Sequence, residues 1–238
     1  MHELLTGLGI ILLYFLVAAS AALLLRKLVR IPDELFRKGL HCILLGSLLV
    51  WVLAFHTWWY AALSALGFAA AVYPLLCLEE RIPGFSAFVT ERKRGELKTS
   101  LLLVFSMFAA VLCVCWGWLG DRLLVLAGVY AWGFGDAAAA LVGKRFGRHA
   151  LTGKHIEGRK SVEGSVAMFT TSFLSVVVIL LFRGGLAWYG YFLIPAVTAS
   201  VAALVELYSL HGTDTVTCPL AATAVLLPLV YWMGGGFS

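Results

Sequence analysis

The feature that most constrains this chain is a series of eight apolar stretches, because a helix needs about 20 apolar residues to cross the hydrocarbon core of a bilayer. Hydrophobic residues make up 61% of the 238 residues and charged residues 13%, which is more apolar surface than a soluble domain of this length could bury. We therefore predict an all-α, polytopic membrane protein with about eight transmembrane helices in a single domain. The predicted spans lie at about Leu4 to Leu25, Leu40 to Ala54, Trp58 to Cys77, Ser100 to Leu119, Leu123 to Val142, Ser165 to Phe182, Leu186 to Tyr208 and Thr217 to Met233.

The positive charges indicate how these spans are oriented. Of the 18 Lys and Arg residues, all but Arg122 and Arg183 fall in the odd-numbered connections. By the positive-inside rule these connections are cytoplasmic and both termini lie outside. The opposite connections are only a few residues long, so we expect any binding or catalytic surface on the cytoplasmic side. Topology alone could also account for part of this charge.

Asp136 is the most informative polar residue, because it falls inside the fifth apolar stretch. In a helix it would lie roughly 12 Å below Lys144, at a depth where a carboxylate needs a cation, a metal or a water-filled cavity. Ala139, Ala140 and Gly143 follow at i+3, i+4 and i+7 on the same helical face. Such a face of small side chains either allows close helix packing or leaves space for a phosphate chain and a metal.

The connection after this stretch alternates glycines with cations, a pattern suited to a backbone that wraps a polyphosphate. Its segment 153–161 resembles a P-loop but is one residue too long before the lysine and lacks a preceding strand, so we reject that motif. The candidate nucleotide contacts are Lys144, Arg145, Gly147, Arg148, Arg159, Lys160, Ser161, Glu163 and Gly164.

Two further polar clusters are predicted on the same side. One has the spacing i, i+3, i+4 and i+7, which places its members on a single helical face: Glu34, Arg37, Lys38 and His41. The other joins Glu206, near the end of the seventh span, to Asp214. Asp214 either caps the eighth helix or is a second metal-binding or general-base carboxylate. The candidate substrate contacts are Arg37, Lys38, His41 and Glu206.

Taken together, these motifs resemble the signature of the CTP-dependent lipid-alcohol kinases, which include dolichol kinase, phytol kinase and CTP-dependent diacylglycerol kinase. The matching segments run in order along most of the chain: RKGLH at 37–41, GDAAA at 135–139, GKRFGR at 143–148, KSVEGS at 160–165 and DTVTCP at 214–219. Thr215 stands where the family usually has asparagine. The signature is distantly similar to that of the CDP-diacylglycerol synthases. Those enzymes carry a later Arg-x-Asp after the first acid, which this chain lacks after Asp214.

The resemblance implies a single transmembrane catalytic domain over residues 1–238 that transfers the terminal phosphate of CTP to a long-chain or isoprenoid alcohol. It implies Asp136, Asp214 and Lys160 as catalytic residues, with Asp136 and Asp214 holding Mg²⁺ or activating the hydroxyl. Lys144, Arg145, Lys160 and Ser161 would position the triphosphate. The expected partners are a lipid alcohol, a nucleoside triphosphate and membrane lipid, with no nucleic acid and with a homo-oligomer left open. We expect a prokaryotic plasma membrane location.

Three other functions fit parts of the sequence. A cytidylyltransferase that makes a CDP-lipid is the nearest alternative. A transporter would line a path across the bilayer with polar residues, but there is no internal repeat and the acids cluster toward one face. An intramembrane aspartyl protease also carries Gly-x-Gly-Asp, but it needs a second aspartate within a neighbouring span. Here the other aspartates lie at span ends: Asp33, Asp121 and Asp214.

Overall fold

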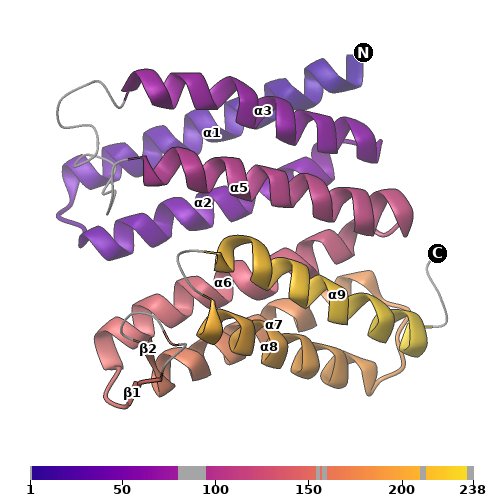
Figure 1. The fold of residues 1–238 in the computed structure, drawn as a ribbon. Helices are drawn as coiled ribbons and strands as arrows, with labels where there is room; N and C mark the ends of the chain where they lie inside the picture. Colours follow the sequence, from indigo (N-terminus) through magenta and orange to yellow (C-terminus); the bar gives the residue numbers. More distant parts are fainter. Residues whose placement is uncertain (1, 80–94, 154–155, 157–159, 210–212, 235–238) are drawn as a thin grey trace. The chain divides into compact units, whose positions relative to one another are not determined.

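The computed structural model describes residues 2–79, 95–153, 156, 160–209 and 213–234, and it divides into two compact units (Figure 1). The first unit is Met1–Cys113 and the second is Val114–Ser238. Each unit is a bundle of helices. The organisation of residues 1–238 as one catalytic domain stays a prediction.

The predicted all-α membrane fold is confirmed. Within the described residues, eight helical segments are long and apolar enough to cross a membrane. The first unit contains α1 (His2–Leu28), α2 (Asp33–Ala54), α3 (Trp58–Glu79) and α5 (Glu96–Val111), which continues into the π-helix η1 (Leu112–Trp118). The second contains α6 (Arg122–Phe146), α7 (Val162–Arg183), α8 (Gly190–Tyr208) and α9 (Asp214–Gly234). The sidedness of the helices stays a prediction from the charge pattern.

Aromatic rings form the core of the first unit. Trp51 of α2 is fully buried and meets Phe68 of α3 and Phe105 of α5, with ring centroids 6.0 and 5.5 Å away. Phe15 of α1 stacks on Phe68 at 4.8 Å. Because aromatic rings bury large areas, this cluster packs α1, α2, α3 and α5 around one centre.

Glu3 ties the start of α1 to the connection between α2 and α3. Its Oε1 accepts the backbone N–H groups of His56 and Thr57 at 2.8 and 2.9 Å, and its Oε2 accepts the Thr57 hydroxyl at 3.0 Å. A carboxylate that accepts free N–H groups at the start of a helix is favoured by the helix dipole. The first turn of the chain is therefore anchored.

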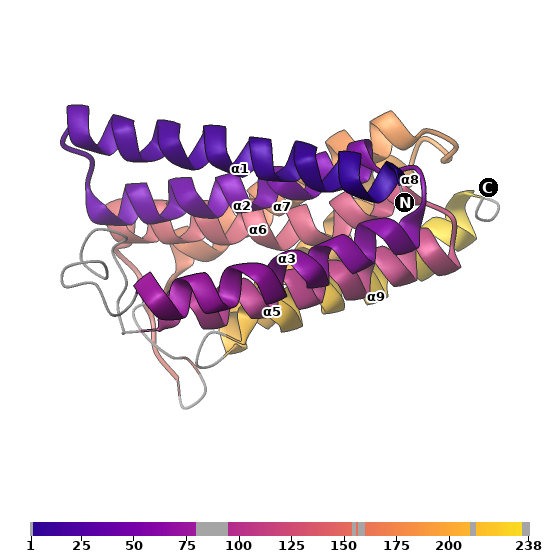
Figure 2. The same cartoon turned by 90° about the horizontal axis from the view of Figure 1, so that it is seen from above.

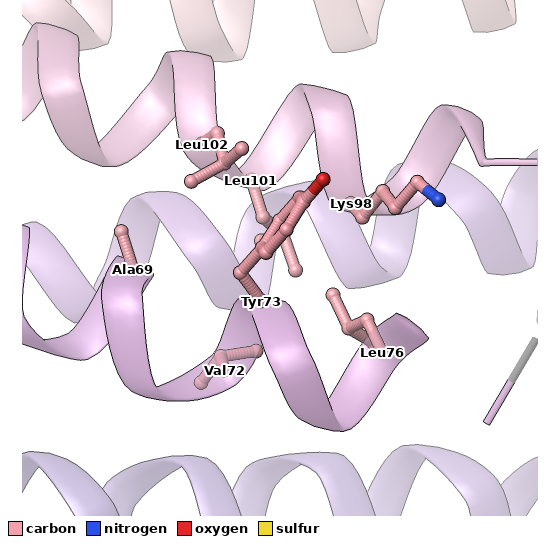
Figure 3. A pocket seen from close by; sticks show the side chains of 7 residues that line it. All are labelled: Ala69, Val72, Tyr73, Leu76, Lys98, Leu101 and Leu102. Atoms are coloured by element: carbon pink, nitrogen blue, oxygen red, sulfur yellow. The ribbon is translucent and has the colours of Figure 1, made fainter. Parts of the chain in front are cut away.

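A shallow crevice runs between α3 and α5 in the first unit (Figure 3). It is lined by Ala69, Val72, Tyr73, Leu76, Lys98, Leu101 and Leu102. It has essentially no space for even a water molecule, whereas typical ligand pockets have volumes of roughly 300–1,000 Å³. We interpret it as a packing seam between two helices and not as a substrate site.

In the second unit, α6 is the most buried helix, and its residues from Leu124 to Gly133 are all buried. Small residues allow α7 and α9 to approach it closely. A Cβ added at Gly135 would overlap Ser172 Oγ of α7, and one added at Gly128 would overlap Thr223 Oγ1 of α9. On the predicted small-residue face, Gly143 also lies against α7, since a Cβ there would be 3.6 Å from Gly164 Cα. Close helix packing thus accounts for part of that face, and space for a phosphate chain stays a prediction.

An ion pair closes the end of the second unit where α6 begins and α7 ends. Asp121 caps α6 by accepting the N–H groups of Leu123 and Leu124 at 3.1 and 3.3 Å. Its other oxygen accepts from the Arg183 guanidinium, and both side chains are 9% exposed. This contact joins one cation and one acid at the opposite end of the unit from Lys144 and Lys160.

Candidate active site

The predicted catalytic residues lie at one end of the second unit, where α6 and α8 finish and α7 and α9 begin (Figure 2). Asp136 belongs to the middle third of α6, ten residues before its end, and Glu206 to the last turn of α8. Asp214 is the first residue of α9, and Lys160 immediately precedes the N-cap of α7. Because consecutive helices run in opposite directions, segments far apart in sequence meet at this end.

Glu206 is the residue around which this cluster is arranged. Its Oε1 lies 3.0 Å from Lys160 Nζ, and the same ammonium donates to the main-chain carbonyl of Glu206. Glu206 is also within electrostatic range of Asp136 and Asp214. Glu206 therefore contacts Lys160 directly and is under the electrostatic influence of two further acids, although only Asp136, Asp214 and Lys160 were predicted to act together in catalysis.

Asp136 and Asp214 are the predicted ligands of Mg²⁺. Within the described residues, no group of three His, Cys, Asp or Glu side chains is close enough to hold a metal. Mg²⁺ is commonly held by one or two carboxylates, with substrate phosphates and water completing its shell. Asp136 and Asp214 fit that requirement by their chemistry.

Asp214 lies in the first turn of α9 and not at its N-cap. The carbonyl of Thr213 accepts the N–H groups of Val216 and Thr217 at 3.0 and 2.9 Å, which makes Thr213 the cap residue. An acid in the first turn is favoured by the helix dipole. Asp214 is half-buried, so its carboxylate is also partly shielded from water.

Ser161 organises the start of α7 within the predicted nucleotide-binding loop. Its Oγ caps the helix by accepting the N–H of Gly164 at 3.2 Å. A Cβ at Gly143 or Gly164 would lie 3.3 Å from this oxygen, and one at Gly147 would lie 2.8 Å from it. These glycines therefore bring the end of α6 against the start of α7, with the Ser161 hydroxyl between them.

A short antiparallel pair and a side-chain contact hold the two arms of this loop. Strand β1 (Ala150–Leu151) pairs with β2 (Lys160–Ser161), and Val162 N–H donates to His149 O at 3.0 Å. Glu163 accepts from the backbone N–H of His149 and lies 2.7 Å from its Nδ1. Sequence reasoning listed Glu163 as a nucleotide contact, whereas its described contacts join the two arms.

Cations surround this end of the unit. Lys144 and Arg145 end α6, and Arg148 follows; all three side chains are exposed. Arg145 also lies over the Phe146 ring, 5.3 Å from its centroid. Arg159 lies outside the described residues. Their role as phosphate contacts stays a prediction.

The remaining predicted substrate contacts belong to the first unit. Lys38 is 7% exposed, Arg37 pairs with Glu34, and His41 is half-buried. These residues continue the stripe of α2 that buries Leu45 and Leu48, so the charged face points toward protein and not toward lipid. Their role as substrate contacts stays a prediction.

Comparison with known proteins decides the family. The chain is 30% identical to a phytol kinase from Synechocystis sp. over 239 aligned residues, which cover 95% of this chain and 93% of that protein. The chain belongs to the lipid-alcohol kinase family. The resemblance inferred from the sequence motifs is thus confirmed at the level of the family. No family model and no solved structure matches the chain.

Two side-chain contacts in the candidate site of this lipid-alcohol kinase were not predicted from the sequence motifs. The Lys160–Glu206 pair joins residues 46 positions apart, and the His149–Glu163 pair joins residues 14 apart across an irregular loop. Helical periodicity relates residues three or four positions apart and carries no information on such pairs. The sequence signal that could have indicated these two pairs was the complementary charge of their members.

Proposed function

We propose that this lipid-alcohol kinase transfers the terminal phosphate of CTP to the hydroxyl of a long-chain or isoprenoid alcohol, giving CDP and a lipid phosphate. Alcohols of the dolichol, polyprenol, phytol or diacylglycerol type fit this proposal. The observation that carries it is the Lys160–Glu206 ion pair in an apolar helical bundle, with Asp136 and Asp214 within electrostatic range of Glu206. Together with the family, such a site favours phosphoryl transfer to a lipid.

In the proposed reaction the lipid hydroxyl oxygen bonds to the γ-phosphorus of CTP, and the bond from that phosphorus to the β–γ bridging oxygen breaks. The hydroxyl proton passes to Asp136 or Asp214, and CDP leaves with the bridging oxygen. Phosphoryl transfer depends mainly on alignment and charge stabilisation, which charged side chains at a buried site can provide. Mg²⁺, when held by Asp136 and Asp214, would neutralise phosphate charge.

The triphosphate is proposed to bind along the loop between α6 and α7. Lys144, Arg145 and Arg148 are exposed beside it, and backbone N–H groups open α7 behind Ser161. Helix N-termini and Lys or Arg side chains are the usual partners of phosphate oxygens. We place this site on the cytoplasmic side of a prokaryotic plasma membrane, where the charge pattern puts these residues.

The reaction is tested with purified protein, CTP labelled at the α or γ phosphate, and each of the four alcohols. A kinase moves the γ label into lipid and leaves the α label in CDP. Incorporation of the α label would instead identify a cytidylyltransferase. Uptake of substrate without nucleotide consumption would favour a transporter, and transfer from ATP but not CTP would overturn the proposed donor.

Asp136 is tested by Asp136→Asn, which keeps the size of the side chain and removes its charge. We expect the γ-label transfer to fall by about 100-fold or more, with thermal unfolding little changed. Asp33→Asn is the matched control, because this substitution removes the same charge at a side chain that is 77% exposed and lies outside the site. Full activity of the Asp136 variant would refute its catalytic role.

A further inference from the structure

The side chain of Lys160 is held by a residue of α8 that lies 46 positions further along the chain. Its ammonium meets Glu206 twice, at Oε1 at 3.0 Å and at the main-chain carbonyl oxygen. The Lys160 and Glu206 side chains are 19% and 15% exposed, so the pair is largely shielded from water. Partly buried, charge-assisted contacts of this kind are stronger and less screened than those on a surface.

The position of Glu206 in its helix adds to this attraction. Glu206 lies in the last turn of α8, where free carbonyl groups give the helix end a partial negative charge. Lys160 belongs to a strand of two residues and thus has little regular structure of its own to orient it. A lysine side chain has about 2 kcal/mol of rotamer entropy, so an unheld ammonium would occupy many positions.

We propose that Glu206 is a positioning residue of the kinase site, and that it fixes the ammonium of Lys160 beside Asp136 and Asp214. Sequence reasoning assigned Glu206 to substrate binding; the contacts instead direct it to Lys160. The ammonium so held offsets the charge of the nearby acids and is directed to where the transferring phosphate would lie. This inference rests on the proposed function for the role of Lys160 in phosphate binding.

A double-mutant cycle tests whether Glu206 acts through Lys160. Glu206→Gln should raise KM for CTP and lower kcat, with kcat/KM reduced roughly 10- to 100-fold, the size expected for losing a charge-assisted contact. Glu206→Asp should recover part of this loss. In a Lys160→Met background, the Glu206→Gln change should have an effect of less than about twofold, because its partner is already gone.

The opposite result would overturn the inference. If the losses from Glu206→Gln and Lys160→Met multiply, Glu206 acts independently of Lys160. If Glu206→Gln lowers thermal stability and kcat/KM alike in both backgrounds, its role is structural. Unchanged kinetics in Glu206→Gln would also refute a positioning role. Asp33→Asn serves again as the control for loss of one carboxylate charge.

Chemical labelling gives a readout that does not require kinase activity. Full-length protein in detergent is treated with an amine-acetylating reagent, and labelling of Lys160 is compared with that of exposed Lys27 by mass spectrometry. In Glu206→Gln the relative labelling of Lys160 should rise roughly tenfold, because its strongest contact is lost. Unchanged labelling would refute the positioning role even if the protein proves to be a kinase. Increased labelling without CTP-dependent activity would refute the proposed function instead.

Discussion

Gly135→Ala offers a direct test of how α6 packs beside the catalytic acid. A Cβ at Gly135 would overlap Ser172 Oγ and lie 2.7 Å from Met168 Sδ. Ser172 is fully buried and donates to the carbonyl of Ala131, so it cannot move aside without losing that bond. Ordinary heavy-atom contacts lie at about 3.5–4.0 Å, so the two helices must separate locally.

The size of the effect follows from three contributions. Overpacking of a close-packed core costs about 1–3 kcal/mol. Loss of the Ser172 hydrogen bond costs about 0.5–1.5 kcal/mol more. Alanine in place of a helical glycine returns about 0.5–1 kcal/mol. We therefore expect a net destabilisation of about 1–3 kcal/mol, which for a protein of this size lowers Tm by roughly 2–4 °C per kcal/mol.

The assay is thermal unfolding of purified protein in detergent, with three comparisons. Gly9→Ala and Gly67→Ala are matched controls, because a Cβ at either position would meet nothing within 4 Å. Both should be neutral or slightly stabilising. Ser172→Ala combined with Gly135→Ala should recover much of the loss, since the clashing oxygen is removed. A Tm for Gly135→Ala equal to that of the controls would refute the close approach of α6 and α7.

Two further predictions concern stability. Arg183→Met should destabilise the second unit by about 3–5 kcal/mol, because it leaves the Asp121 carboxylate buried without its partner. In thermal unfolding, the combined Asp121→Asn and Arg183→Met variant should show a smaller loss of Tm than Arg183→Met alone. Ser161→Ala should cost about 0.5–2 kcal/mol through loss of the α7 cap, whereas Ser161→Gly should cost only about a few tenths of a kcal/mol. Equal losses in the two variants would argue against capping by the hydroxyl.

The apolar stretches predicted every span, because lipid requires long continuous helices whatever the side-chain packing. The ends of the helices were less predictable. The second span was placed from Leu40, but α2 begins at Asp33, since its first two turns are helical and charged. The seventh was placed from Leu186, but α8 begins at Gly190, after Gly184 and Gly185 adopt positive φ values of 69° and 71°.

The candidate site was predictable by residue type and not by pairing. Asp136 stood out because a carboxylate in an apolar span needs compensation, and the resemblance added Asp214 and Lys160. That Lys160 pairs with Glu206 depends on how α8 packs against the start of α7, which no local pattern encodes. Gly147 was assigned to nucleotide binding, but a side chain there would overlap the Gly143 carbonyl oxygen, so packing alone already requires a glycine.

The boundary between the two units falls inside the π-helix η1, between Cys113 and Val114. At this boundary the chain is therefore hydrogen-bonded helical backbone and not an irregular linker. Because a π-helical turn is closed by hydrogen bonds to the fifth residue along and not the fourth, it is wider than an α-helical turn. The side chains around Val114 are therefore turned out of the register that α5 sets.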